Sequence, residues 1–416
     1  MKILQINKFF FLKGGAERHF FDLSELLTKK RHQVSTWSTK HPQNFFWPQE
    51  ELFAQYSDFS KKESLIKDLK KIQRIFWNRE AKQKLEEVIR QEKPDIAHLH
   101  NIMSHLSPSV IYTLKKHNIP IVMTLHDYKM FCPNYKFFSK GEICFDCLKK
   151  NNFHSCLSKR CIKNSWSKSL VGYLESKWQK DFLKIADKID VFLAPTSFMK
   201  RQAMAAGIPG GKIVHLPYFI DPEFLKNLAH QKKSNSEEKY LLYFGRLSKE
   251  KGIDLLILSF LKNLSKLSKW KLKIMGEGPE KIKLERLASR YKQIEFLGKK
   301  KGQELKEIIS QAYLVIVPSV WAENFPFAVL ESLAFKKAVL AARIGGLPEM
   351  IEDKKTGLLF KPNNLIDLIR KTTWAVNNPK KIREIGRQAH KKIIEKCDSE
   401  KYYQKLIKIY ERIQNN

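Results

Sequence analysis

The chain has 416 residues, and 43% of them are hydrophobic. Because one hydrophobic core usually serves no more than ~250 to 300 residues, a chain of this length is expected to form two domains. Lys and Arg number 77 against 43 Asp and Glu, a net charge of +34 that indicates an anionic partner: nucleic acid, an anionic membrane surface or phosphorylated substrates. The alternative is that part of the excess is only a solvated surface. No run approaches the ~20 apolar residues that span a bilayer.

The first residues show no targeting segment. Residues 1–6 are typical of a first buried strand, and the apolar run at 9–12 is too short for the hydrophobic part of a signal peptide. We therefore expect a cytoplasmic protein, or one that is peripheral on the inner face of the cell membrane.

The first half alternates short apolar runs with helical patterns, which predicts a Rossmann-like unit of six or seven strands. Residues 227–239 are polar and lack apolar periodicity, so we expect an N-terminal domain at 1–220 with its boundary near 217–222. The expected strands are 2–7, 33–38, 95–101, 119–128, 191–195 and 214–217, and the expected helices are 18–27, 61–91, 165–186 and 197–205.

The second half repeats the alternation and predicts a second doubly wound parallel sheet at 221–397. Ligands bind such sheets at the carboxyl ends of their strands, so the loops after these strands should form one rim. Residues 367–416 are helical and basic. The expected strands are 240–244, 270–275, 294–296, 314–317, 338–341 and 358–360.

Gly14 and Gly15 follow the first strand and precede a helical run from Arg18. Two glycines there let the backbone approach a ligand at the carboxyl edge of the sheet. The alternative is a tight turn that feeds a helix.

Polar residues end two further strands of the first half. His98, His100 and Asn101 follow one apolar run, and His126 and Asp127 follow another. These positions face a ligand at the carboxyl edge of the sheet. From the residues alone, a histidine at a strand end can equally be satisfied by a loop carbonyl.

Five of the six cysteines lie between 132 and 161, which favours a local metal or redox device over a distributed disulfide framework. Two close pairs are separated by eight residues, a spacing that suits a tetrahedral structural zinc. Cys132 or His154 could replace one ligand. The alternatives are free cysteines or a disulfide, and a catalytic thiol is disfavoured because no base stands at fixed spacing. The expected ligands are Cys144, Cys147, Cys156 and Cys161.

The stretch YLLYFGRLSKEKG, residues 240–252, combines an apolar strand, Gly245 and the cations Arg246 and Lys251, followed by a helical pattern. A glycine, a helix N-terminus and two cations together are how an α/β protein builds an anion site. Five positions separate Arg246 and Lys251, so they converge on one ligand only if the segment is a loop. A plain turn with solvated lysines is the alternative.

Two later motifs accompany this stretch. Glu323 and Glu331 are eight apart with Pro326 between them, and a GGxPE sequence begins at Gly345. The order GRLxxEKG, E-x7-E, GGxPE resembles the nucleotide-sugar half of glycosyltransferase family 4. The resemblance covers the whole chain and implies the GT-B fold: two Rossmann-like domains facing a cleft, with a final segment, 398–416, that crosses back to the first domain.

The resemblance implies roles for individual residues. Glu331 accepts hydrogen bonds from the ribose hydroxyls, Glu323 faces the donor sugar, and His126 lies beside the reacting sugar. Pro326 suits the first turn of a helix, so Glu323 should lie in the loop before it and Glu331 on the helix. The further positions assigned to the nucleotide sugar are Gly14, Gly15, Gly245, Gly276, Phe325, Gly345 and Gly346.

The sequence contains no Asp-x-Asp motif, which many transferases use to bind a catalytic divalent metal. We therefore expect no catalytic metal, and we expect Arg246 and Lys251, assisted by the amides of Gly345 and Gly346, to stabilise the diphosphate leaving group. The resemblance further implies retention at the anomeric carbon, so the predicted function is a retaining transferase that moves a hexosyl group from a UDP- or GDP-linked sugar to a glycan or lipid-linked cell-envelope acceptor. An anionic membrane surface is an expected partner, and the oligomeric state is left open.

Two rival interpretations remain. The first is a basic, zinc-stabilised nucleic-acid-binding protein, although basic residues are spread throughout and no RNA- or DNA-binding signature appears. The second is an inactive relative retained for binding. The presence together of Arg246, Lys251, Glu323 and Glu331 disfavours it.

Overall fold

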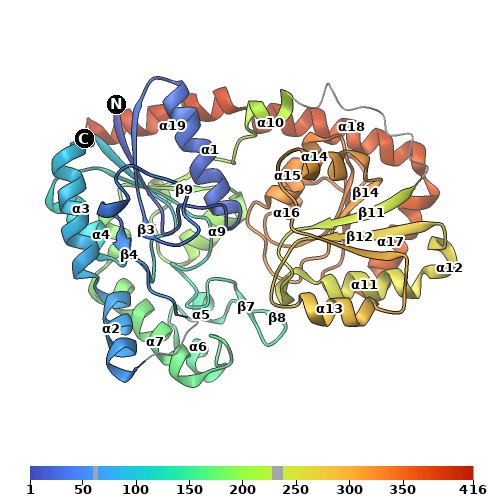
Figure 1. Ribbon diagram of the computed structural model, residues 1–416, viewed down its shortest axis with the longest axis horizontal. Helices are drawn as coiled ribbons and strands as arrows, with labels where there is room; N and C mark the ends of the chain where they lie inside the picture. The colour runs from blue at the N-terminus through green and yellow to red at the C-terminus, as the bar shows by residue number, and fades with distance from the viewer. Residues whose placement is uncertain (60–63, 227–237, 416) are drawn as a thin grey trace. The chain divides into compact units, whose positions relative to one another are not determined.

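The computed structural model describes residues 1–59, 64–226 and 238–415 (Figure 1). It divides into two compact units, of which the first comprises Met1–Lys140, Cys144–Tyr218 and Glu400–Asn416, and the second Gly141–Ile143 and Phe219–Ser399. These limits lie within two residues of the expected 220 and 397. Most of the expected polar linker, 227–239, falls outside the described residues.

The first unit is built on a six-stranded parallel sheet in the order β10-β9-β6-β5-β1-β2. Strands β5, β6 and β9 are buried at every residue, as expected when helices cover both faces of a parallel sheet. The order reverses between β1 and β5, and α/β sheets bind ligands at the carboxyl edge of such a reversal. The strands are β1 (Lys2–Ile6), β2 (Gln33–Trp37), β5 (Ile96–Leu99), β6 (Ile121–Thr124), β9 (Val191–Ala194) and β10 (Ile213–His215).

One expected helix of this unit is two helices. The pattern at 61–91 forms α2 and α3, which are separated at Trp77 and Asn78. The break occurs because the Asn78 side chain accepts a hydrogen bond from the amide of Ala81 at 3.0 Å and starts a new helix there. The apolar face of α2 is only partly covered: Ile75 is buried, whereas Leu69 is 65% exposed. Residues 60–63 lie outside the described part of the chain.

The expected helix at 165–186 is also interrupted, by a π-helical turn at Trp178–Phe182. The segment between β6 and α7 has only short elements. The helices and short strands of the first part of the chain are α1 (Gly15–Lys29), α2 (Leu65–Phe76), α3 (Arg79–Glu92), α4 (Ser109–Lys116), α5 (Asp146–Lys149), α6 (His154–Ser158), α7 (Trp166–Lys177), α8 (Ile185–Lys188), α9 (Ser197–Ala205), β3 (Thr39–Lys40), β4 (Ala54–Gln55), β7 (Phe138–Ser139) and β8 (Glu142–Ile143).

The second unit has its own six-stranded parallel sheet, in the order β13-β12-β11-β14-β15-β16, so the predicted pair of doubly wound sheets is confirmed. Its order reverses between β11 and β14, which places the GRLxxEKG and E-x7-E loops at the reversal. The strands are β11 (Lys239–Phe244), β12 (Trp270–Met275), β13 (Ile294–Gly298), β14 (Leu314–Val317), β15 (Val339–Ala342) and β16 (Leu358–Phe360).

Helices lie on both sides of the second sheet. Figure 1 shows α11, α13 and α17 on one side and α14, α15 and α16 on the other. The helices are α10 (Pro222–Lys226), α11 (Ile253–Lys262), α12 (Leu264–Leu267), α13 (Lys281–Ala288), α14 (Gly302–Gln311), α15 (Phe327–Ala334), α16 (Leu347–Met350), α17 (Leu365–Asn377) and α18 (Pro379–Lys396).

The last helix, α19 (Ser399–Gln414), packs in the first unit although it follows the second in sequence. It lies beside α1 (Figure 1), where Lys30 pairs with Glu400 and the His19 ring is 3.1 Å from the Tyr402 hydroxyl. The buried Tyr410 hydroxyl joins Nδ1 of His98, on β5, at 2.6 Å. Tertiary hydrogen bonds thus anchor the C-terminal residues to the first sheet.

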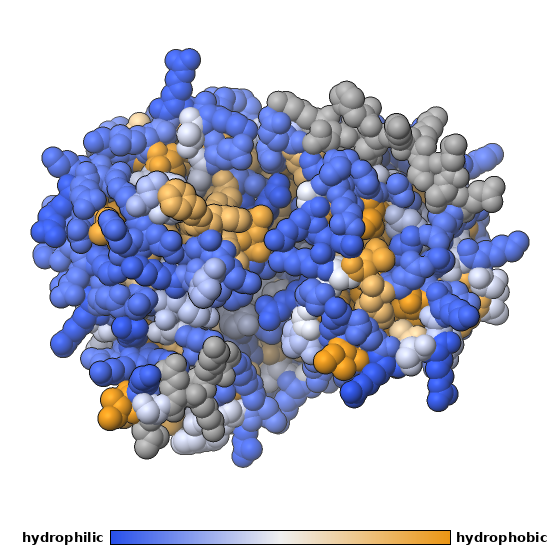
Figure 2. All heavy atoms as spheres, in the orientation of Figure 1, coloured by the Kyte–Doolittle hydropathy of each residue, from blue (hydrophilic) through white to orange (hydrophobic). Residues whose placement is uncertain are grey.

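The surface is in keeping with the charge of the chain. Figure 2 shows hydrophilic side chains over most of the visible face of each unit. Within the part of the chain that the structure describes, no helix combines the length and the apolar character that crossing a membrane requires.

Candidate functional site

The loops after β11, β12, β14 and β15 are pressed together at the carboxyl edge of the second sheet. Gly276 has φ +149°, and a Cβ atom there would lie 1.8 Å from the carbonyl oxygen of Gly245. Gly278 is equally confined, because a Cβ atom there would lie 2.2 Å from the Leu247 carbonyl oxygen. Glycine is therefore required because the backbone of the neighbouring loop occupies the place of a side chain. The two loops form one rigid surface.

The GGxPE loop packs against the E-x7-E loop in the same way. Gly345 has φ +60°, and its Cβ would lie 2.2 Å from the Glu323 carbonyl oxygen. The amide of Gly346 donates to that same oxygen at 2.7 Å. Gly346 was expected to offer its amide to a diphosphate, but in the structure this donor is used to position Glu323. The glycine pair thus acts on the candidate site through Glu323.

Lys251 and Glu323 form the centre of this edge. Nζ of Lys251 lies 2.7 Å from Oε1 of Glu323, whose side chain is only 4% exposed, and the hydroxyl of Ser319 donates to the same oxygen at 2.5 Å. The Lys251 ammonium also lies over the Trp321 ring, 5.0 Å from its centroid. Burial with two donors holds the carboxylate in one orientation. Lys251, which was expected to stabilise the diphosphate, is one half of an ion pair in this structure.

Arg246 differs from Lys251 because its side chain is exposed and makes no hydrogen bond or ion pair within the described residues. Its backbone is fixed instead: the buried Tyr243 hydroxyl donates to the Arg246 carbonyl oxygen at 2.8 Å. Burial, followed by the charges of Glu323 and Glu250, raises the pKa of Tyr243, so this hydroxyl remains a donor. Arg246 is thus a solvated cation on a rigid loop that precedes the 3-10 turn Lys249–Lys251.

The two glutamates occupy the places expected from Pro326. Pro326 is the N-cap of α15, Glu323 lies in the loop before it, and Glu331 lies on the helix, partly exposed. Phe325 is 5% exposed, so it packs inside the loop more than it lines a surface. Sequence reasoning missed Ser319 and Trp321, which lie between β14 and Glu323.

In the first unit, Gly14 and Gly15 are exposed at the start of α1. Gly14 is the N-cap and supplies no side-chain cap, and the carboxylate of the buried Glu17 lies in the first turn of this 15-residue helix. A Cβ at Gly14 would meet nothing closer than Glu17 Oε2 at 3.7 Å, so bulk does not require glycine there.

His126 belongs to a chain of hydrogen bonds at the carboxyl edge of the first sheet. Its Nε2 lies 2.8 Å from Nδ1 of His100, and its Nδ1 lies 2.6 Å from the Tyr218 hydroxyl. His100 in turn contacts Oε1 of Gln5, on β1, at 2.7 Å. Burial, followed by the charges of His98 and Lys8, lowers the pKa of His126 to about 3. His126 is therefore a neutral hydrogen-bonding group whose two ring nitrogens both have protein partners.

The surrounding histidines are buried and neutral as well. Burial lowers the pKa of His98 to about 3, and burial with the neighbouring histidines lowers the pKa of His19 and His100 well below the usual range. His19, His100 and His126 each offer a ring nitrogen within 4.8 Å of the others. We call His19, His98, His100 and His126 the histidine cluster. His19 and Tyr218 were not singled out from the sequence, because only the fold brings α1 and the residues after β10 to this edge.

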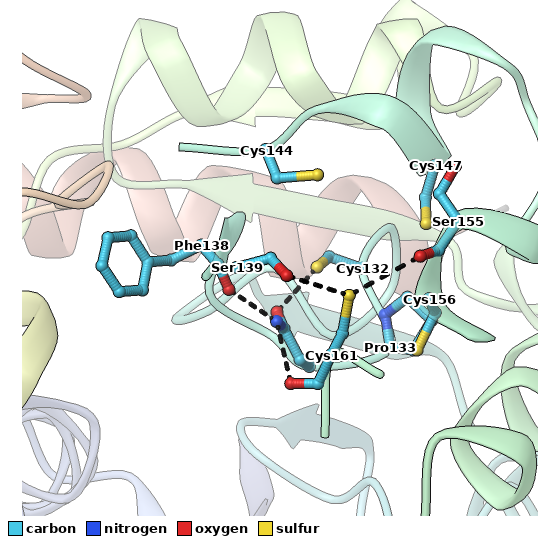
Figure 3. A pocket seen from close by; sticks show the side chains of 10 residues that line it. Cys132, Pro133, Phe138, Ser139, Cys144, Cys147, Ser155, Cys156 and Cys161 are labelled. Carbon is cyan, nitrogen blue, oxygen red and sulfur yellow. Dashed lines mark hydrogen bonds between the residues drawn. The ribbon is translucent and has the colours of Figure 1, made fainter. Parts of the chain in front are cut away.

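The cysteines of the predicted zinc site lie around one small cavity (Figure 3). All five between 132 and 161 line it, with side chains directed inward from separate short segments. His154, an expected substitute ligand, is absent from the lining and contacts the Tyr173 hydroxyl at 3.2 Å. Burial raises the pKa of Cys132 to about 11 and that of Cys147 to about 12, so both are thiols in this structure.

Two family models match the chain. Residues 13–224 match the model described as Glycosyltransferase Family 4, and residues 226–392 match Glycosyl transferases group 1.

Similar proteins include the sulfoquinovosyl transferase SQD2 of Arabidopsis thaliana, 26% identical over 74% of this chain and 54% of that protein. An uncharacterised 42.6 kDa protein of the Klebsiella pneumoniae cps region is 25% identical over 84% of this chain and 87% of its own length. The alignments to the first curated relatives span about half of their length.

Solved structures share the fold. Sucrose-phosphate synthase from Thermosynechococcus elongatus superposes with a TM-score of 0.73 at 16% identity, covering 99% of both chains. HepE of Anabaena in complex with UDP-glucose superposes with a TM-score of 0.67 at 16% identity, covering 99% of this chain and 100% of that one.

Proposed function

This chain belongs to glycosyltransferase family 4 and has the GT-B fold, and from that premise we propose that it is a retaining glycosyltransferase. The donor is a UDP- or GDP-linked hexose, and the acceptor is a glycan or lipid-linked molecule of the cell envelope. Support for the donor class comes from HepE, which was solved with UDP-glucose. Support for the acceptor class comes from the relative of the cps region.

The observation that carries the proposal is the charged edge of the second sheet. An exposed Arg246 on a rigid loop precedes the oriented pair of the partly exposed Lys251 and the buried Glu323. A diphosphate needs cations held in place before the reaction, since preorganised charge stabilises a leaving group without reorganisation. The ion pair supplies an oriented ammonium and an oriented carboxylate together, so one can bind a phosphate oxygen while the other accepts from a sugar hydroxyl.

In the proposed reaction, the bond between the anomeric carbon and the donor phosphate oxygen breaks, and a bond from the acceptor oxygen to that carbon forms on the same face. The acceptor proton passes to the departing diphosphate, which leaves as a nucleoside diphosphate. Arg246 and Lys251 offset the negative charge that grows on the leaving oxygen. Glu323 orients the sugar, and Glu331 binds the ribose hydroxyls.

The first unit contributes neutral donors and acceptors. With a pKa near 3, His126 does not serve as a general base near neutral pH, so its role is to orient a hydroxyl of the donor or acceptor. To do so, it must exchange one of its present partners, His100 or Tyr218, for the substrate. The exposed backbone of Gly14 and Gly15 contacts the diphosphate or an anionic acceptor.

A thermal-shift screen of UDP- and GDP-sugars tests the donor. A ligand at 100 times its Kd stabilises the folded state by about 2.7 kcal/mol, so the correct donor raises Tm while the other nucleotide leaves it unchanged. The absence of a shift with every nucleotide sugar, together with steeply salt-dependent binding of oligonucleotides, would instead identify a nucleic-acid-binding protein.

Two matched variants test the charged edge. Arg246→Ala should abolish the donor-dependent shift, whereas Lys249→Ala, which removes an exposed cation three residues away, should retain it. Equal shifts in both variants would refute the assignment of Arg246. With the donor in hand, NMR of the product gives the anomeric configuration: retention supports the proposed reaction, and inversion contradicts it.

We also propose that the basic surface holds the enzyme on an anionic membrane, where a lipid-linked acceptor is found. The net charge of +34 supports this, as do the exposed Ile66 and Leu69 on the lysine-rich helix α2. Cosedimentation with phosphatidylglycerol vesicles should fall steeply with salt, and binding to phosphatidylcholine vesicles should be weak. Equal binding to both would contradict an electrostatic attachment.

A further inference from the structure

The insert between β6 and α7 has little to hold it in one conformation. Its regular elements are four or five residues long at most. Tyr128 and Phe137 are almost fully buried, but within residues 139–164, which carry the two cysteine pairs, the buried apolar side chains are Cys147, Phe153 and Cys156. Residues 139–164 therefore bury little apolar surface to offset the entropy of ordering them, and some other tie is needed for this part to keep a defined structure.

Backbone conformation adds to this cost. Seven of the sixteen described non-glycine residues with positive φ lie in this one segment, and left-handed conformations at such residues cost of order 1 kcal/mol or more each. Conformations of this kind persist only where the surroundings impose them. The seven are Tyr135, Phe137, Lys140, Asn151, Arg160, Lys163 and Asn164, with φ between +49° and +56°.

The feature that can impose them is the cavity of Figure 3. We call Cys144, Cys147, Cys156 and Cys161 the four-cysteine set. Its members come from the loop before α5, from α5, from α6 and from the turn after α6, and all line one cavity of about 10 Å³. That volume holds a single small sphere, such as a water molecule or a metal ion.

We propose that the four-cysteine set binds one structural zinc ion that cross-links the insert. Four thiolates from separate segments are the usual ligands of a closed, tetrahedral zinc site. A single ion would join all of these segments, which are otherwise held by a small core and by backbone hydrogen bonds such as that from the Cys161 amide to the Cys156 carbonyl at 3.0 Å. One disulfide could join only two of them. This site is independent of the nucleotide-sugar chemistry proposed above.

Small rotations of the side chains complete the site. Within the described residues, no three of the cysteine sulfurs lie within 4.8 Å of one another, whereas sulfurs on one zinc are about 3.8 Å apart. Changing the rotamer of a cysteine moves its sulfur by roughly 3 Å without moving the backbone. The contacts to be given up are weak, such as Cys161 Sγ to Ser139 Oγ at 3.5 Å and to the Ser155 carbonyl at 3.8 Å.

Two contacts agree with this choice of ligands: one between Lys159 and Cys144, and one that involves the fifth cysteine, Cys132. Zinc with four thiolates carries two negative charges, and Nζ of Lys159, 3.4 Å from Cys144 Sγ, lies where it offsets part of them. Cys132 is set apart because its thiol donates to Oδ1 of the buried Asn134 at 3.0 Å. Asn134 also donates to the Phe138 carbonyl at 2.7 Å. The hydrogen bond between Cys132 and Asn134 is therefore part of the wall of the cavity.

Elemental analysis of the full chain, purified under reducing conditions, tests the proposal. We expect about one zinc per chain in the native protein and about none in Cys144→Ser/Cys147→Ser. Cys397→Ser changes a buried cysteine of the second unit and should keep the zinc, as should Cys132→Ser. Loss of zinc in Cys132→Ser with retention in Cys156→Ser would overturn the ligand set.

Because the double variant can fail for lack of folding, cobalt provides a second measurement on the native chain. Exchange of the metal for Co²⁺ should produce the intense thiolate charge-transfer bands and the d–d bands of a tetrahedral sulfur site. Native protein without zinc, or with cobalt bands that indicate nitrogen and oxygen ligands, overturns the proposal. An intact mass lower by two hydrogens would identify a disulfide in its place and overturn it equally.

Discussion

Each unit has a six-stranded parallel sheet whose order reverses once, although the two strand orders differ, and the carboxyl edges of the two sheets are chemically opposite. The carboxyl edge of the second sheet carries charged side chains, namely the exposed Arg246 and the oriented pair of Lys251 and Glu323. The first sheet ends in the histidine cluster, where burial keeps the rings neutral. Two parallel sheets of the same size therefore serve two electrostatic purposes, and the residues that follow each strand decide which one.

The difference has a physical basis in solvation. A diphosphate is bound by cations that lie near water, because an unpaired charge cannot be buried without a large penalty. A sugar or acceptor hydroxyl needs only neutral donors and acceptors, which can be buried if they bond to one another, as His126, His100 and Tyr218 do. Four changes test this contrast.

The largest effect is expected from Lys251→Ala, which removes the ammonium of the charged edge. We expect turnover to fall by about 10²- to 10³-fold, since one preorganised group on a developing charge is worth that much. Lys249→Ala, a neighbouring exposed lysine, should leave turnover near that of the native enzyme. The measurement is the initial rate with saturating donor, and native-like turnover of Lys251→Ala would remove the ion pair from the mechanism.

Gly276→Ala should destabilise the second unit by roughly 3 kcal/mol, because its Cβ would lie 1.8 Å from the Gly245 carbonyl oxygen and φ is +149°. Gly302→Ala is the control: it also has positive φ, +56°, but open space around its Cβ, so we expect about 1 kcal/mol. Denaturant unfolding followed by hydrogen exchange locates the loss. Equal destabilisation in both variants would mean that strain, and not the close approach of the loops, requires Gly276.

The histidine cluster should make the first unit sensitive to acid. His98 and His126 titrate near pH 3 when folded and near 6.5 when unfolded, so between these values the unfolded chain binds more protons. Stability is therefore complete above about pH 6.5 and falls as the pH is lowered toward 3, by up to about 1.4 kcal/mol per pH unit for each histidine. Hydrogen exchange at pH 7 and pH 5 should show loosening of β5 and β6 before β14 and β15. Simultaneous loosening of both sheets would contradict this account.

The smallest effect is expected from Tyr410→Phe, which removes the hydroxyl that bonds to His98 at 2.6 Å. A buried hydrogen bond of this kind contributes about 1 kcal/mol, and its loss should be confined to the first unit and to α19. Tyr403→Phe, whose hydroxyl contacts the partly exposed His32 at 2.9 Å, should cost less. A larger effect of Tyr403→Phe would place the main attachment of α19 at its exposed edge.

More of the charged edge than of the histidine cluster could be predicted from the sequence. Motifs such as GRLxxEKG name glycines and cations within a few positions of a strand end, so their place at the sheet edge follows from the strand alone. The histidine cluster draws on α1, on β5 with the residue after it, and on the loop after β6. No local pattern links these residues with one another or with Tyr218. The predicted single helix at 61–91 was wrong because a side-chain cap at Asn78 outweighs a continuous apolar pattern.

The sequence alone determined the two parallel sheets and their order of elements, since apolar runs, glycines and helical periodicity act over a few neighbouring residues. Tertiary structure decided how the named residues are used. It made Lys251 the partner of Glu323, directed the Gly346 amide to the Glu323 carbonyl, and joined α19 to the first sheet through His98. Hydrogen bonds and ion pairs depend on separations in space of about 3 Å, and only the folded chain sets these between residues far apart in sequence.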